Sequence, residues 1–180
     1  STASVRINPE QSRFAVLMSS AASFDPRDNI VEMAIKKLDL AKQKGFDGMY
    51  QSNRSWWKKF WEKSFVQMSS ADGKAGLVEQ SYNYYLYVMA SSSRGAYPPK
   101  FNGMLWTTGG DARKWGNLYW GANQSCLYNA LFPANRWELI DPMFNMYSSM
   151  REACEIAARQ QWGSKGIFIP ETVAFDGMAP

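Results

Sequence analysis

The stretch "DNIVEMAIKKLDLAKQKGFDGMYQSNRSWWKKFWEKS" (residues 28–64) has the clearest hydrophobic periodicity in the chain and decides its fold class. Asp28 is a suitable N-cap, and apolar residues follow it at helical spacing, namely Ile30, Ala34, Leu38 and Ala41. Gly45 is expected to end this helix, and a second helix is expected from Asp47 to Ser64. The sequence therefore predicts a mainly α-helical protein.

The end of this stretch, "RSWWKKFWEK" (54–63), mixes basic and aromatic residues and allows two interpretations. Proteins that bind single-stranded nucleic acid combine the same residue types. At helical spacing, however, Trp57, Phe60 and Trp61 share one face and the lysines another, as in an ordinary amphipathic helix. Because the net charge is only +4 and the basic residues are dispersed, we favour the amphipathic helix and expect no nucleic-acid partner.

The remaining elements are predicted from shorter patterns. The run "FAVLMSS" (14–20) indicates a buried strand, and "GIFIPE" (166–171) is the next most strand-like segment. Residues 91–117 lack periodicity and are rich in Gly, Pro and Ser, which is typical of a long functional loop. Further helices are expected around 77–88, at 120–131 and after Asp141-Pro142, the last with one face formed by Met143, Tyr147, Met150, Cys154 and Ala157.

Composition excludes several kinds of chemistry. The chain has no histidine, which removes Ser-His-Asp and Cys-His nucleophile systems and His-based metal sites. Cys126 and Cys154 do not have the spacing of metal ligands, so we expect neither a metal nor a cofactor. No apolar run approaches the ~20 residues of a membrane span, and the N-terminus lacks the features of a signal peptide. We expect a soluble protein without a membrane partner.

The segment "NLYWGANQSCLYN" (117–129) places Asn123, Gln124 and Ser125 between aromatic residues. These polar groups either form a buried hydrogen-bonded network or line a pocket with aromatic walls. The chain also has eight Trp residues, and aromatic faces stack well on sugar rings, although Trp residues more often fill a protein core. Of Trp106, Trp115 and Trp120, we expect at least one to stack on a sugar.

The order of the motifs resembles the catalytic region of glycoside hydrolase family 95, the alpha-L-fucosidase-like enzymes. "FAVLMSSAASFDPRDN" (14–29) is similar to the last strand of that family's β-sandwich and its linker, and "SWWKKFWEKS" (55–64) to its "WxxFW"-like helix. "ASSSRGAYPPKFNGMLW" (90–106) is similar to its "SSRPGxLPxNLQGLW"-like loop. The resemblance implies the end of a β-sandwich domain over residues 1–27 and part of an (α/α)6 barrel over residues 28–180, within a larger polypeptide.

The same resemblance implies roles for individual residues. "NQSCLYNALFPA" (123–134) is similar to the family's "NxN…N…WPA" pattern, whose first two asparagines position the attacking water of an inverting reaction. Asn123 matches the first, whereas Ser125 stands in place of the second, which indicates a different mechanism or sugar. "IPETVAFDG" (169–177) is similar to the loop that lines the sugar pocket, with Glu171 and Asp176 as its polar groups.

These residues also have ordinary structural interpretations. Glu171 is either a site carboxylate or a solvated or helix-capping residue, and Asp176 suits an Asx-turn before Gly177. Two carboxyl groups ~6.5–9.5 Å apart are needed for inverting hydrolysis. In the resembling family the general acid lies beyond the position of Pro180.

The sequence thus predicts a segment of a secreted or periplasmic glycoside hydrolase that acts on a carbohydrate without a metal. Asn123 and Glu171 are its candidate catalytic residues. Its candidate substrate-binding residues are Trp106, Trp115, Trp120, Gln124, Ser125 and Asp176. The alternative is a non-catalytic carbohydrate-binding or structural helical module.

Overall fold

The structure is a computed structural model that describes residues 4, 6, 14–100 and 118–177. The chain divides into two compact units, Ser1–Glu62 and Lys63–Pro180. The described part is mainly helical, as the periodicity predicts. The two units are defined by contacts within the chain and do not test whether a β-sandwich domain ends at residue 27. That domain boundary stays a prediction. Within the described residues, no helix is both long enough and apolar enough to cross a membrane.

The first unit contains most of α1 (Ile30–Lys63) and the segment before it. Asn29 precedes the helix, and its side-chain oxygen accepts the backbone N–H of Glu32 at 3.1 Å. The helix is kinked at Gly45, whose φ of 69° and ψ of 167° suit only glycine. The predicted break at Gly45 is therefore confirmed, and the predicted N-cap lies one residue further along the chain than Asp28.

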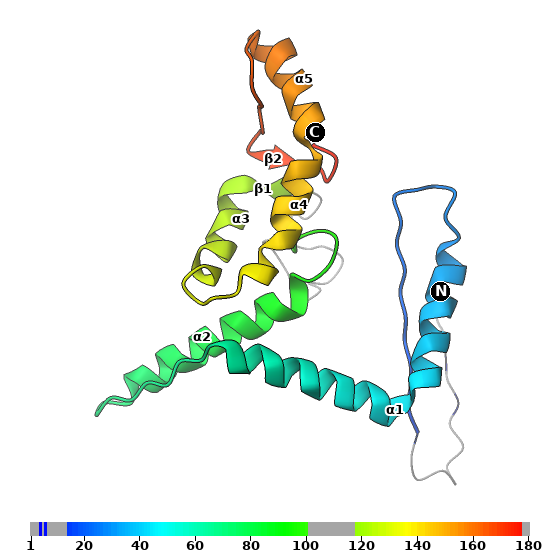
Figure 1. Cartoon of the computed structure of the whole chain (residues 1–180), viewed down its shortest axis with the longest axis vertical. Helices are drawn as coiled ribbons and strands as arrows, with labels where there is room; N and C mark the ends of the chain where they lie inside the picture. The colour runs from blue at the N-terminus through cyan, green and yellow to red at the C-terminus, as the bar shows by residue number, and fades with distance from the viewer. Residues whose placement is uncertain (1–3, 5, 7–13, 101–117, 178–180) are drawn as a thin grey trace. The chain divides into compact units, whose positions relative to one another are not determined.

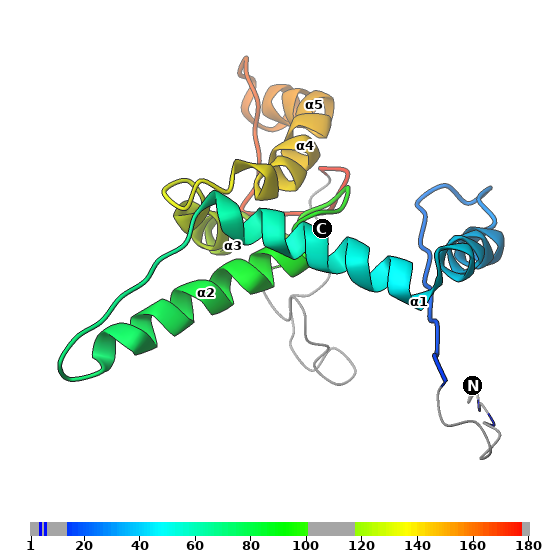
Figure 2. The ribbon, with the colours of Figure 1, turned by 60° about the horizontal axis from the view of Figure 1, so that its bottom comes forward.

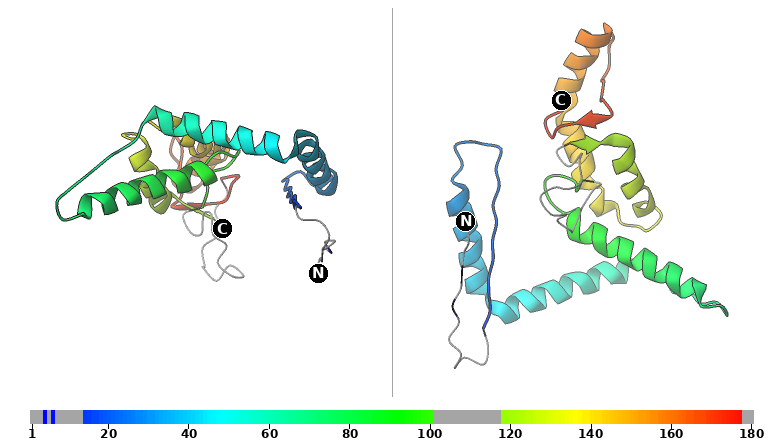
Figure 3. Two further views of the ribbon diagram at one scale, coloured as in Figure 1. Left: turned by 90° about the horizontal axis from the view of Figure 1, so that it is seen from below. Right: turned by 180° about the vertical axis from the view of Figure 1, so that it is seen from behind.

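The predicted buried strand at 14–20 is wrong. Residues 14–22 contain no regular strand, and Phe14, Val16 and Met18 are exposed. The segment runs beside the first half of α1 (Figures 1 and 3), where Lys37 Nζ donates a hydrogen bond to the carbonyl of Ser20 at 3.0 Å. A short apolar run becomes a buried strand only where another strand pairs with it, and no described strand does so here.

The second half of α1 has the predicted amphipathic character. Phe60 is buried and Trp57 and Trp61 are half-buried, whereas Lys58 and Lys59 are exposed. The aromatic rings form a contiguous group, with Trp57 and Trp61 stacked at 6.0 Å between centroids. The amphipathic interpretation of this segment is confirmed.

In the second unit, residues 64–70 lack regular secondary structure and a turn at 71–73 leads into the straight helix α2 (Lys74–Ser92), as Figure 2 shows. The unit continues with β1 (Tyr119–Trp120), α3 (Gly121–Tyr128) and the short 3-10 turns η2 (Asn129–Leu131) and η3 (Trp137–Leu139). α4 (Asp141–Ser149) and α5 (Arg151–Trp162) follow. The chain then returns alongside α5 to β2 (Thr172–Val173), as Figures 1 and 3 show. The predicted helix at 77–88 is confirmed. The helix predicted at 120–131 is confirmed over Gly121–Tyr128, whereas Trp120 lies in β1 and residues 129–131 form a 3-10 turn.

The predicted fifth helix is interrupted at Met150 and forms two helices, α4 and α5. Its buried face agrees with the prediction only in part. Met150 and Cys154 are buried as predicted, whereas Met143, Tyr147 and Ala157 are half-buried, and the buried positions beside them are Pro142, Met146 and Ala158. Tyr147 is half-buried and packs beside the core cluster formed by Tyr119, Met146, Met150, Cys154 and Val173.

The strand-like segment predicted at 166–171 lies a few residues too early. The two-residue strand β2 pairs antiparallel with β1, with Tyr119 opposite Val173 and Trp120 opposite Thr172. Pro170 limits pairing before this point because it lacks a backbone N–H. The ladder brings residues about fifty positions apart together and places Glu171 beside the start of α3.

Candidate functional site

A cavity of about 350 Å³ lies beside the N-terminal turn of α3, between this helix, α4 and the segment before β2. Two predicted site residues, Ser125 and Glu171, meet at this cavity. Its wall is mixed in character, with a hydroxyl, a phenol, a carboxylate and several apolar side chains. The lining residues are Gly121, Ala122, Ser125, Met143, Phe144, Tyr147, Ile169, Pro170 and Glu171.

Glu171 is positioned by the β1–β2 ladder. Its carbonyl accepts the backbone N–H of Gly121 at 2.8 Å, and its Oε1 accepts the backbone N–H of Ala122 at 3.2 Å. The carboxylate thus satisfies a donor in the first turn of α3, where the helix dipole favours negative charge. The helix-capping interpretation of Glu171 is confirmed, and the same geometry keeps this side chain on the cavity wall.

Tyr147 connects the cavity to the protein interior. Its hydroxyl donates to Gln124 Oε1 at 3.1 Å, while Gln124 Nε2 donates to the carbonyl of Pro99 at 3.4 Å. Burial raises the pKa of the Tyr147 phenol, and the negative charge of Glu171 raises it further. The phenol and the carboxylate therefore interact electrostatically at the same site.

Gln124 itself belongs to the buried network rather than to the cavity wall. Its side chain is only 1% exposed and has hydrogen bonds at both ends. The first of the two interpretations of "NLYWGANQSCLYN" therefore describes Gln124, while the pocket interpretation describes Ser125. Helical spacing explains the difference, because adjacent residues of α3 point about 100° apart.

Asn123 does not share the cavity with Glu171. It is exposed, and it lies two residues from both Gly121 and Ser125, which puts it about 200° around the helix from these lining residues. The structure thus brings Glu171 together with Ser125 and not with Asn123. A water molecule held by Asn123 and Glu171 jointly is not supported by this arrangement.

The other predicted residues lie elsewhere. Trp120 is half-buried in β1, and it is not among the described residues that line the cavity. Asp176 is exposed in a turn closed by a 3.1 Å hydrogen bond from Gly177 N to the carbonyl of Ala174. The bond that closes this turn joins backbone groups, so the Asx-turn predicted for the Asp176 side chain stays a prediction. Trp106 and Trp115 lie outside the described residues.

The aromatic residues that do line the cavity, Phe144 and Tyr147, were not predicted as site residues. The periodicity predicts Tyr147 on the buried face of a continuous helix, and it predicts no role for Phe144. The Phe144 ring is 53% exposed, which leaves it accessible to a ligand. The relevant signal is the phase of α4, where Met143, Phe144 and Tyr147 form one side at positions i, i+1 and i+4.

The chemistry available at the cavity is limited to hydrogen bonding, stacking and one negative charge. Within the described residues, no group of three or more Cys, Asp or Glu side chains is arranged to hold a metal ion. The Ser125 hydroxyl donates to the carbonyl of Ala122 at 2.9 Å and keeps its lone pairs as acceptors. The cavity can therefore bind a polar ligand that presents both hydroxyl groups and an apolar face.

The chain matches no protein-family model, no curated protein and no solved structure. The resemblance to glycoside hydrolase family 95 rests on the motifs alone.

Proposed function

We propose that this chain is a carbohydrate-binding segment of a glycoside hydrolase. The observation that carries the proposal is the meeting of Ser125, Glu171 and the rings of Phe144 and Tyr147 at one cavity. Sugars present an apolar C–H face and a rim of hydroxyl groups, which aromatic rings and polar oxygens bind respectively. The motif resemblance to family 95 points to the same class of ligand.

In this proposal Glu171 binds sugar hydroxyls rather than acting as the general acid. Its Oε1 already accepts a backbone N–H, and the negative charge is placed at a helix N-terminus. The general acid would therefore come from another part of the polypeptide.

The second candidate function is carbohydrate binding without hydrolysis. It is favoured by the observation that one carboxylate and no second acid lines the described cavity. The two candidates share the ligand and differ only in whether a glycosidic bond is cleaved.

The test combines ligand binding and hydrolysis. Neutral monosaccharides, including L-fucose, are titrated into the protein while amide chemical shifts are recorded, and a panel of aryl glycosides is assayed for release of the aryl group. Saturable shifts at Ala122, Ser125 and Glu171 support carbohydrate binding, and aryl release by the protein supports hydrolysis. Saturation without release supports the non-catalytic alternative, and the absence of saturation with every sugar contradicts both.

Matched variants assign the binding to this cavity. Phe144→Ala removes an exposed ring, and we expect affinity to fall about tenfold, since stacking contributes roughly 1–1.5 kcal/mol. Phe132→Ala is the control, because Phe132 is also partly exposed and does not line this cavity. Equal effects of both substitutions would place the sugar elsewhere.

A further inference from the structure

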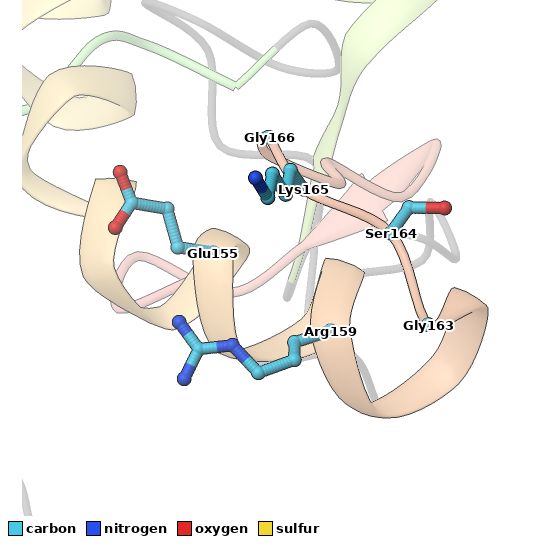
Figure 4. A pocket seen from close by; sticks show the side chains of 6 residues that line it. All are labelled: Glu155, Arg159, Gly163, Ser164, Lys165 and Gly166. Atoms are coloured by element: carbon cyan, nitrogen blue, oxygen red, sulfur yellow. The ribbon is translucent and has the colours of Figure 1, made fainter.

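A second cavity, of about 360 Å³, lies between α5 and the turn that follows it. It is lined by Glu155 and Arg159 of the helix and by Gly163, Ser164, Lys165 and Gly166 of the turn. In Figure 4 the Glu155 and Arg159 side chains leave the same side of α5, and the Ser164 hydroxyl points away from them. This cavity shares no lining residue with the candidate sugar site.

The charges of this second cavity are unbalanced. Glu155 Oε1 is paired with Arg151 Nε at 2.8 Å, one helical turn earlier. Arg159 and Lys165 form no ion pair with any acidic side chain that the structure describes, and both are exposed. The cavity therefore presents two cationic groups whose charge is not neutralised nearby, while its one carboxylate already has a partner.

The partial negative charge at the C-terminal end of α5 repels an anion only weakly at this cavity, because the last carbonyls accept hydrogen bonds. Gly163 adopts a φ of 59°, its N–H donates to the carbonyl of Arg159 at 3.1 Å, and Ser164 N–H donates to the carbonyl of Ala158 at 3.3 Å. The first bond is that of an αL C-cap, and both bonds satisfy carbonyls at the negative end of the helix. Gly166 follows with a φ of 106°, and both Lys165 and Gly166 line the cavity.

We propose that this cavity binds an oxyanion, that is, a carboxylate, sulfate or phosphate group of a small ligand. The Arg159 guanidinium supplies donors in a planar fork that matches two oxygens of such a group, and Lys165 supplies a second positive charge. The described lining contains no aromatic side chain, so the anionic group and not a ring is what the site recognises. The proposal does not depend on the proposed carbohydrate function.

The test is a titration of the protein with sodium sulfate, sodium phosphate and D-galacturonate at constant ionic strength, with D-galactose as the uncharged comparison. Amide shifts of Gly163 to Gly166 report binding. We expect saturation with at least one of the three anions and none with D-galactose. The three arms distinguish a sulfate or phosphate site from a carboxylate site.

Charge variants test the assignment to named residues. Arg159→Gln and Lys165→Gln should each weaken binding about fivefold, which is the scale of an exposed charge pair. Glu155→Gln should strengthen binding, because it removes the repelling carboxylate and releases Arg151. Lys59→Gln is the control, since it lowers the net charge equally but belongs to α1 and does not line this cavity.

Two results would overturn the proposal. One is the absence of saturable binding of all three anions to the unaltered protein. The other is an equal effect of Lys59→Gln and Lys165→Gln, which would mean that only the net charge of the molecule attracts the anions.

Discussion

Glu171 and Tyr147 give the candidate site a measurable electrostatic signature. The pKa of Tyr147 is raised first by burial and then by the negative charge of Glu171. A negative neighbour disfavours the phenolate, so its removal must lower the pKa of the phenol. We predict that Glu171→Gln moves the pKa of Tyr147 part of the way back toward its ordinary value of 10.0 and that burial keeps the remainder of the shift.

The measurement is an alkaline titration followed by tyrosinate absorbance, with Tyr147→Phe used to identify the contribution of this phenol. Glu155→Gln is the control, because it removes a carboxylate from the other cavity. A pKa of Tyr147 that is the same in the unaltered protein and in Glu171→Gln would show that the two groups do not interact.

Arg136 is the one charged side chain that is completely buried among the described residues. Its Nη2 donates to the carbonyl of Ser64 at 2.9 Å, and burial lowers the pKa of its guanidinium. Arg136→Ala leaves that carbonyl without this donor and creates a cavity, so we predict a loss of about 3 kcal/mol in the free energy of unfolding. Arg136→Met keeps most of the volume and should lose roughly half as much.

Urea denaturation followed by far-UV circular dichroism measures both losses. Arg27→Ala is the control, because this side chain is 87% exposed and its one ion pair among the described residues is with Asp25, two positions earlier. Its removal should leave the unfolding midpoint unchanged. If Arg136→Ala and Arg27→Ala have similar midpoints, the buried guanidinium is not structurally important.

At the scale of elements, Ser93 joins the end of α2 to two later segments. It is fully buried, and its hydroxyl donates to the carbonyl of Leu139 at 2.7 Å. Because that donation uses its only proton, the 3.1 Å contact with the Tyr128 hydroxyl must be donated by Tyr128. Ser93→Ala leaves two buried polar groups without this partner, so we predict a loss of about 2 kcal/mol in unfolding free energy.

Ser92→Ala provides a matched control in the same turn. Ser92 donates to the carbonyl of Val88 in its own helix, and such local bonds contribute little. We expect its unfolding free energy to change by less than about 0.5 kcal/mol. Comparable losses for both variants, measured by urea denaturation, would contradict the role of Ser93 as a junction.

Elements whose ends are encoded locally could be predicted from the sequence. Gly45 breaks α1 because glycine alone accepts its backbone angles, and the amphipathic pattern of 54–63 is complete within one helix. The break at Met150 has no such local signal. Met150 lies next to Gly177, and that contact is made by a segment more than twenty residues away, which periodicity cannot reveal.

The candidate site was predictable to a similar extent. Ser125 and Glu171 were identified from motifs, but the phase of α3 that turns Asn123 away from the cavity follows from where the helix packs. Phe144 and Tyr147 were missed because the cavity that they line exists only where Ile169, Pro170 and Glu171 lie beside α3 and α4, which follows from the β1–β2 pairing. Both are tertiary effects.

The contact between Gly177 and Met150 supports a prediction of its own. Gly177 has a φ of 84°, and a Cβ added there would lie 2.9 Å from Met150 Cβ. Gly177→Ala therefore combines backbone strain with a steric clash, and we predict a loss of about 2–3 kcal/mol in unfolding free energy. Gly163→Ala, at a φ of 59° with open space around it, should show only the strain of about 1 kcal/mol. Equal losses in urea denaturation would show that no clash occurs.

At the scale of the whole molecule, the buried residues are distributed very unevenly between the two units. Among the described residues of Ser1–Glu62, only Phe60 is buried. All the other buried residues that the structure describes lie in Lys63–Pro180. Burial of apolar surface is the main favourable term in folding, and an isolated helix with little packing is only marginally stable in water. The two units should therefore differ strongly in their stability as separate chains.

We predict that a protein consisting of residues 63–180 unfolds cooperatively in urea, whereas residues 1–62 alone lose helical signal gradually without a clear transition. The protein of residues 63–180 retains the Lys63–Glu138 ion pair at 2.8 Å and the hydrogen bond from Arg136 to the carbonyl of Ser64. Arg136→Ala should consequently lower its midpoint as it does in the full chain. Cooperative unfolding of 1–62 together with an unfolded 63–180 would contradict the prediction, because it would place the stabilising core in α1 rather than around α2 to α5.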